Sequence, residues 1–115
     1  MDMFFGDFSE SEVDQVEQSM ARIISLALAA KASGDKELAR RVARDALRQI
    51  QRNKDHPSRA FYLTIAKAIN AHCFDRAGRA KLLMKRVIVD KVIAQAPADQ
   101  ALARAVVATC QIALT

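Results

Sequence analysis

Apolar residues recur at steps of three and four positions along most of the chain, and this spacing places them on one face of an α-helix. The first predicted helix runs from about residue 10 to about Ser33, with Ser9 and Glu12 forming a capping box at its start. Gly34 is expected to end this helix, because glycine adopts the left-handed conformation that closes many helices. The apolar face consists of Val13, Val16, Met20, Ile23, Ile24, Ala27 and Ala30.

The second predicted helix runs from Lys36 to about Gln51, with Asp35 as its N-terminal cap. One face is an alanine-rich seam made of Ala39, Val42, Ala43, Ala46, Leu47 and Ile50. The opposite side carries an arginine at every fourth position, which we call the arginine row: Arg40, Arg44, Arg48 and Arg52. Residues four apart share one stripe of the helix surface. The row is therefore expected either to meet phosphate or carboxylate groups or to face solvent.

Residues 53–57 interrupt the helical pattern, and Pro57 is expected at the first position of a third helix, with Asp55 or His56 as its cap. The apolar face of the third helix consists of Phe61, Tyr62, Ile65, Ala66, Ile69 and Cys73. A break is expected near residues 72–74, and the alternative is one long helix that bends at Gly78. Either arrangement continues the helical pattern.

A fourth predicted helix carries its apolar residues at Ala77, Ala80, Leu83, Met84, Val87, Ile88, Val92 and Ile93. Pro97 is expected to begin a fifth helix, which has no charged residue after Arg104 and is therefore expected to be buried in the core or in a subunit interface. The sequence thus predicts an all-α fold, a compact bundle of about five helices. Residues 1–8 form an N-terminal arm, and residues 9–115 form a single domain.

Composition supports a folded chain with a strong charge asymmetry. Hydrophobic residues make up 51% of the sequence, aromatic residues only 5%, and tryptophan is absent, so alanine and aliphatic side chains must supply the packing. Residues 1–21 contain six acidic and no basic residues, whereas residues 22–115 hold all 18 basic residues and a net charge of +11. Such a basic body attracts nucleic acid, anionic lipid or an acidic partner, or it is a solvated surface that the acidic head partly neutralises.

The N-terminal arm combines acidic residues with three of the five phenylalanines, Phe4, Phe5 and Phe8. We expect the arm to dock in a groove of its own chain, because three exposed phenylalanines favour aggregation. The alternatives are docking on another protein or a terminal segment without a role.

The turn between the first two helices resembles the tetratricopeptide repeat, and the likeness extends over about residues 20–88. The matching positions of the turn and the second helix are Gly34, Asp35, Ala39, Ala46 and Leu47, and those of the first helix are Leu26 and Ala27. A second copy runs through residues 61–88, and residues 74–77 resemble the start of its second helix, which places Ala77 38 positions after Ala39. The resemblance implies antiparallel helical hairpins and a peptide-binding groove lined by the first and third helices.

Catalytic and cofactor patterns were not found in the sequence. His72 and Cys73 are adjacent and so point in different directions on a helix, and the three glycines are isolated from one another. We therefore predict no catalysis, no metal site and no cofactor. The sequence lacks the basic start of a signal peptide and any run of 18 apolar residues, so we expect a cytoplasmic protein without a membrane span, its two cysteines reduced.

These patterns together predict a protein–protein interaction module, acting as an adaptor, chaperone or regulator that binds a helix or peptide of a partner protein, with an acidic protein among the candidate partners. A homodimer through the C-terminal helix or the N-terminal arm is also expected. The alternative is a basic regulator that binds nucleic acid through the arginine row. The predicted partner-binding residues are Phe4, Phe5, Phe8, Arg40, Arg44, Arg48 and Arg52.

Overall fold

Five helices make up the regular structure of the residues that the computed structural model describes, which are residues 10–89 and 99–114. They are α1 (Glu10–Ala32), α2 (Lys36–Arg52), α3 (Arg59–Cys73), α4 (Ala77–Val89) and α6 (Gln100–Leu114). The described residues contain no strand. The predicted all-α bundle of about five helices is therefore confirmed.

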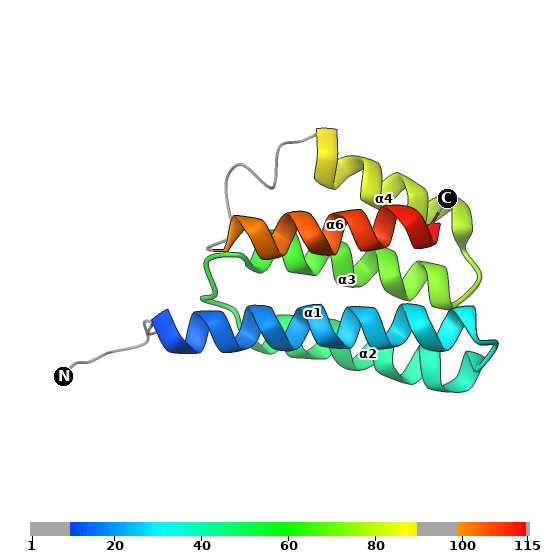
Figure 1. Ribbon diagram of the computed structural model, residues 1–115, viewed down its shortest axis with the longest axis horizontal. Coiled ribbons are helices and arrows are strands. Elements are labelled where there is room, and N and C mark those ends of the chain that lie inside the picture. The colour runs from blue at the N-terminus through cyan, green and yellow to red at the C-terminus, as the bar shows by residue number, and fades with distance from the viewer. Residues whose placement is uncertain (1–9, 90–98, 115) are drawn as a thin grey trace.

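The helices form two antiparallel hairpins and a covering helix (Figure 1). α1 packs against α2, α3 packs against α4, and α2 joins the two hairpins by packing against α3. α6 runs in the same direction as α1 and α3 and packs on both α1 and α4, in front of α3 in Figure 1. The groove that the resemblance implied between α1 and α3 is thus on the side of the bundle over which α6 lies.

The two hairpin turns share one backbone geometry. At the end of α1, the amide of Asp35 donates to Ala30 O at 3.0 Å while Gly34 has a φ of +87°. At the end of α3, the amide of Arg76 donates to Ala71 O at 2.7 Å while Asp75 has a φ of +63°. Both are the Schellman motif, which closes a helix with one left-handed residue.

The two turns fix the register between the hairpins. Every equivalent pair of turn residues, such as Gly34 and Asp75, lies 41 positions apart in the sequence. Ala39 therefore corresponds to Ala80, and both side chains are completely buried, whereas Ala77 is exposed. The expected match of Ala77 to Ala39, 38 positions apart, is wrong. The left-handed residue of the second turn is Asp75, and an aspartate does not mark such a turn in the sequence as a glycine does.

The helix ends agree with most of the predicted boundaries. The carboxylate of Asp35 accepts a hydrogen bond from the amide of Leu38 at 3.1 Å, which confirms the predicted cap of α2. The break between α3 and α4 is also confirmed. The placement of Pro57 is wrong by two positions, because Ser58 is the N-cap and α3 begins at Arg59. His56 forms the preceding turn, its carbonyl accepting from the amide of Arg59 at 3.1 Å.

α3 is the central helix of the core. The apolar face predicted for it is completely buried, and so are the three alanines of the α2 seam, Ala39, Ala43 and Ala46. The small seam residues let α2 approach α3 closely. The side-chain Nδ2 of Asn70 on α3 donates to Ala43 O at 2.7 Å and to Ala66 O at 2.9 Å, which fixes the register of the two helices.

α6 buries only one face. Its buried residues are Ala103, Val106, Val107, Cys110 and Leu114, whereas Ile112 is 79% exposed. Within the described chain α6 is therefore not buried on all sides, and burial of its exposed face in a subunit interface stays a prediction. The reason is that α6 packs on α1 and α4 from one side only.

A buried polar cluster lies where α1 meets the turn before α3. Glu17 and Ser58 are completely buried, and the hydroxyl of Ser58 donates to Glu17 Oε1 at 3.4 Å. The Nδ1 atom of His56 accepts from the amide of Ser58 at 3.0 Å, and the His56 Nε2 atom lies 3.2 Å from Val13 O. Burial raises the pKa of the Glu17 carboxyl above 4.5, although the Asp99 amide and His56 oppose this shift.

Candidate anion-binding site

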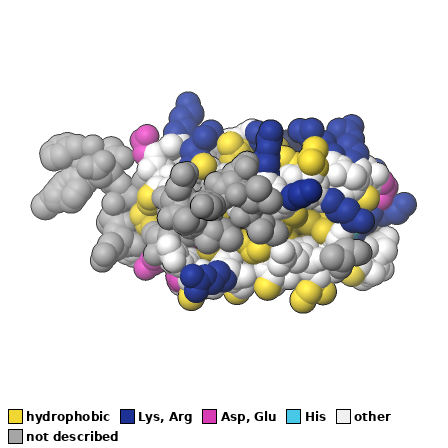
Figure 2. Space-filling view, turned by 90° about the horizontal axis from the view of Figure 1, so that it is seen from above, with side chains coloured by type: hydrophobic (Ala, Val, Ile, Leu, Met, Phe, Trp, Pro, Cys, Tyr) yellow, Lys and Arg dark blue, Asp and Glu magenta, His cyan; other side chains and the backbone are white. Residues whose placement is uncertain are grey.

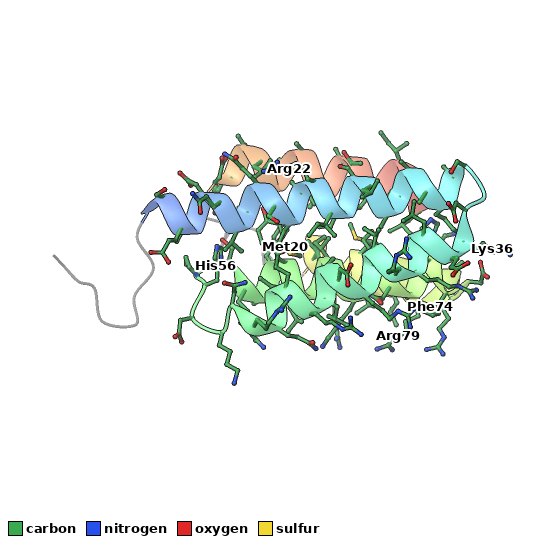
Figure 3. All side chains as sticks on the ribbon, turned by 90° about the horizontal axis from the view of Figure 1, so that it is seen from below. Met20, Arg22, Lys36, His56, Phe74 and Arg79 are labelled. Atoms are coloured by element: carbon green, nitrogen blue, oxygen red, sulfur yellow. The ribbon has the colours of Figure 1, made fainter. Side chains whose placement is uncertain are left out.

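One strip of α3 is not covered by its neighbours, and a pocket of about 380 Å³ opens over it between α2 and α4. Its lining comes from three helices and from the turn that joins α3 to α4. The lining residues are Arg44, Leu47, Lys67, Asn70, Ala71, Phe74, Arg76 and Arg79. The pocket therefore lies on a different side of α3 from the implied groove, and Figure 3 shows Phe74 and Arg79 near the end of the bundle where Lys36 begins α2.

The floor of the pocket is apolar and held in place by α2. Phe74 is the C-cap residue of α3, and its ring lies beside Leu47 and Ala71 in the lining. The guanidinium carbon of Arg40 is 5.1 Å from the centre of this ring and that of Arg44 is 5.5 Å from it. At these distances both cations are attracted to the ring, which holds Phe74, at the end of α3, against α2.

Four cationic side chains surround this floor. Arg44 comes from α2, Lys67 from α3, Arg76 from the turn and Arg79 from α4, and the lining contains no acidic residue. Among the described residues, no carboxylate forms an ion pair with any of these four side chains. Like charges that converge without counter-charges produce a positive potential, which attracts an anion. Figure 2 shows lysine and arginine side chains gathered along one long edge of the molecule.

The start of α4 adds to this potential. α2 begins with the Asp35 cap and has Glu37 in its first turn, both of which oppose the positive end of the helix dipole. Arg76 stands at the position equivalent to Asp35, and α4 has no acidic residue in its first turn. The positive end of the α4 dipole is therefore not offset by an acidic side chain of its own first turn.

The four members of the arginine row have four different environments. Arg40 is half-buried and donates from Nε to Cys73 O at 3.2 Å and from a terminal nitrogen to Asp75 Oδ2 at 3.2 Å. Arg44 is exposed and lines the pocket. Arg48 lies 3.7 Å from the carboxylate of Asp45, and both side chains of this pair are largely exposed. Arg52 is exposed at the end of α2. Only Arg44 of the predicted row therefore contributes to the pocket.

Asp75 pairs with Arg40, which lies over the Phe74 ring but is not part of the pocket lining. Its carboxylate also forms ion pairs with Lys31, at the end of α1, and with Lys36, at the start of α2. The hydrogen bond from Lys31 is the main reason that the pKa of Asp75 lies below 3.8. Asp75 thus links the two hairpin turns.

The other predicted site residues, Phe4, Phe5 and Phe8, lie outside the described residues.

Sequence reasoning did not assign Lys67 and Phe74 to a site. The sequence does show Arg76 and Arg79 as part of a second basic cluster, which together with the arginine row is a candidate track for a phosphate backbone. It does not predict that these two residues meet Arg44 at one pocket. A helical spacing joins Lys67, Ala71 and Phe74 on one stripe of α3. The available signal was Lys67, a single lysine among the mainly apolar residues of this helix, which marks the exposed strip of α3.

Other kinds of site are not found in the described part of the chain. Residues 10–89 and 99–114 bring no three His, Cys, Asp or Glu side chains together in a way that could hold a metal ion. Cys73 and Cys110 are free and buried, and burial raises the pKa of both thiols, that of Cys110 to about 12. No helix of the described residues combines the length and the apolar composition needed to cross a bilayer.

Comparisons with known proteins give no assignment for this chain. No protein-family model matches the sequence, and neither the curated proteins nor the solved structures show a significant similarity to it. The function is therefore argued from the pocket and its surroundings.

Proposed function

We propose that the protein is a non-catalytic interaction module that binds an acidic segment of a partner protein in the pocket between α2 and α4. The observation that carries this proposal is the convergence of Arg44, Lys67, Arg76 and Arg79 around an apolar floor, with no acidic residue in the lining. A peptide carrying acidic and apolar side chains matches both parts of such a surface.

The shape of the pocket favours a peptide segment over a small substrate. The pocket is open along the uncovered strip of α3, and its walls are two helices that run in the same direction (Figure 1). An extended or helical segment can lie along such walls while its acidic side chains reach the cations. The resemblance to tetratricopeptide repeats supports the same role, although the pocket lies on another side of α3 from the implied groove.

Nucleic acid is the second candidate partner. Exposed basic residues continue beyond the pocket on both walls, including Arg41 and Arg52 on α2 and Lys81 and Lys85 on α4. A phosphate backbone binds to extended tracks of this kind with a strong dependence on salt. We rank this role second because the cations of the pocket converge on one place, around an aromatic floor.

Self-association is a further part of the proposal. The exposed face of α6 includes Ile112 and several alanines, which supports a homodimer through this helix. Sedimentation of the full chain tests this part, and a strict monomer at high micromolar concentration would contradict it. A regulatory, adaptor or chaperone role in the cytoplasm is consistent with such a module.

The binding proposal is tested by fluorescence anisotropy with labelled acidic peptides and with duplex DNA, at about 50 mM and about 200 mM salt. The variant R44A/R79A removes two cations of the pocket, and its matched control R41A/K81A removes two exposed cations from the same two helices. We expect the acidic peptides to bind the native protein and the control, and to bind R44A/R79A at least tenfold more weakly, since charge-assisted hydrogen bonds contribute about 1.5–3 kcal/mol each.

Two results would contradict this proposal. Equal loss of peptide binding in both double variants would show that the general charge, not the pocket, is responsible. Tight DNA binding that both variants reduce equally, with no peptide binding at the lower salt concentration, would favour the nucleic-acid role.

A further inference from the structure

The proposed function leaves open which acidic group the pocket selects, and the arrangement of its cations points to an answer. Resting on the proposed binding of an acidic segment, we propose that the pocket selects a phosphate monoester carried by a side chain of that segment. The module then binds the phosphorylated form of its partner in preference to the unmodified form.

The number and direction of the cations favour a phosphate over a single carboxylate. Arg44, Lys67 and Arg79 approach from three different helices, and Arg76 approaches from the turn. A carboxylate carries one charge and two oxygens in one plane, which two of these groups satisfy. A phosphate monoester carries a charge of about −1.5 to −2 and three oxygens that point in different directions. It therefore uses donors from several sides at once.

The arginines suit this group in their chemistry as well. A guanidinium donates two parallel hydrogen bonds to a phosphate, a geometry that a lysine ammonium lacks. Three of the four cations are arginines, and each comes from a different segment of the chain. The start of α4, which has no acidic residue in its first turn, adds a positive dipole beside Arg76 and Arg79.

Access at the start of α4 is open. A Cβ atom added at Gly78, between the side chains of Arg76 and Arg79 in sequence, would meet nothing within 4 Å. This supports the approach of a tetrahedral group on a protein side chain, which brings its own backbone close to the helix. Gly78 is not part of the pocket lining, so the open space beside it concerns access to the pocket and not the charge of the pocket.

The aromatic floor disfavours a nucleotide. Phe74 is the single aromatic residue of the lining, and the guanidinium groups of Arg40 and Arg44 lie over its ring at 5.1 and 5.5 Å. A nucleobase that stacked on this ring would compete with those contacts. Nucleic acid also presents phosphodiesters, each with one charge, spaced along a strand and not concentrated at one point.

Arg40 and Asp75 are positioning residues in this proposal. Arg40 is held by Asp75 and by the carbonyl of Cys73, and it contacts the ring of Phe74 without being part of the lining. The hydrogen bond from Asn70 to Ala43 O similarly fixes the wall that carries Arg44. The aromatic floor and the α2 wall are therefore in place before a ligand arrives, which lowers the entropic cost of binding.

The test uses three pools of short labelled peptides with degenerate acidic flanks and a central serine, glutamate or phosphoserine. Anisotropy titrations of the full chain measure the affinity for each pool. We expect the phosphoserine pool to bind about tenfold more tightly than the glutamate pool, because of its larger charge and additional acceptor oxygens. R44A/R79A should lose this preference, whereas R41A/K81A should retain it.

A second readout depends on the titration of the ligand. The second pKa of a phosphate monoester is about 6, so affinity for the phosphoserine pool should fall between about pH 7.5 and about pH 5.5. The lining contains no histidine and no carboxylate, and the glutamate pool measured at the same pH values corrects for changes elsewhere in the protein, such as at His72 and Asp75.

The outcomes separate this inference from the proposed function. Equal affinity for the glutamate and phosphoserine pools would overturn the selection of phosphate and leave the binding of acidic segments intact. No binding of any pool would overturn both. Phenyl phosphate that competes with the phosphoserine pool, where benzoate does not, supports the inference. Competition by both to the same extent contradicts it.

Discussion

Replacing Glu17 by glutamine is expected to stabilise the protein at neutral pH and to remove part of the pH dependence of its stability. Glu17 is completely buried, and its Oε1 atom receives two long hydrogen bonds, from the Ser58 hydroxyl at 3.4 Å and from the Asp99 amide at 3.5 Å. Its Oε2 atom has no hydrogen-bond partner among the described residues. Burial disfavours the charged form of this carboxyl, and one of its two oxygens lacks a donor among the described residues.

The expected size follows from these contacts. A buried polar group that lacks its hydrogen bond costs about 1–3 kcal/mol, and a charged group costs more. Glutamine keeps the oxygen to which Ser58 and Asp99 donate, and it places an amide beside the hydroxyl of Tyr62, whose pKa is raised by burial and by the nearby Glu17 carboxyl. We expect E17Q to be more stable by about 1–2 kcal/mol, a rise in Tm of about 4–8 °C for a domain of this size.

The dependence on pH gives the sharper test. Because the pKa of Glu17 is raised on folding, its unfavourable effect is complete above that folded pKa, fades as the pH falls, and disappears below 4.5. The advantage of E17Q should therefore be largest at about pH 7.5 and shrink toward about pH 4.5. Burial lowers the pKa of His72, which destabilises both proteins on acidification and cancels in the difference between them.

Urea unfolding followed by circular dichroism, on both proteins at several pH values, measures this difference directly. The reasoning is refuted by an E17Q protein that is less stable than the wild type at neutral pH. It is equally refuted by an advantage that stays the same at every pH, because the charge of Glu17 would then not be its cause.

Three further predictions concern the packing and the turns. Ala43→Leu should destabilise the protein by about 1–3 kcal/mol in urea unfolding, because Ala43 is completely buried between α2 and α3, whereas Ala60→Leu at an exposed site should change little. Gly34→Ala should lower the Tm because its φ of +87° strains an L-residue, while Gly78→Ala, in a helix with open space around it, should raise the Tm; effects of equal sign would contradict the assignment of the turn. The Cys110 thiol should react with a thiol reagent only slowly in the native protein and rapidly in urea, since it is buried and its pKa is raised to about 12; fast native labelling, mapped by mass spectrometry, would show that this face of α6 is not held against α1 and α4.

Local signals predicted the helices well because each depends on neighbouring residues. Gly34 and Asp35 carry the conformation and the hydrogen-bonding group that end α1 and begin α2, and both act as expected. Pro57 misled because a proline suits several positions before a helix, and the turn formed by His56 decides which one it takes. No local sequence signal tells which of these positions Pro57 takes.

The register of the second hairpin was not predictable from the repeat pattern. Asp75 adopts the left-handed conformation that glycine usually provides, and its long-range ion pairs with Lys31 and Arg40 accompany that conformation. Arg76 likewise stands where a capping residue would mark the start of α4. Both positions are explained by contacts with the first hairpin and with the pocket, which no local pattern encodes.

The candidate site is a product of the tertiary structure. Arg44 and Lys67 lie on different helices, and only the packing of α2 against α3 places them on one pocket. The arginine row was visible as a stripe, but its members differ in their partners, and those partners lie more than 30 positions away for Arg40. A stripe of like residues on a helix therefore predicts a charged surface, but it does not predict which partner each residue of the stripe contacts.

The position of α6 has a consequence for the order in which the protein folds. The most extensive contacts join helices that follow one another in the chain, so the two hairpins form by local encounters, which are fast. α6 contacts α1 across most of the sequence and packs only after α1 and α4 together present a surface. It buries one face made mainly of small residues, so it is also the element whose release costs least. Amide hydrogens of α6 should therefore exchange with solvent well before those of α3, which its neighbours surround on nearly every side.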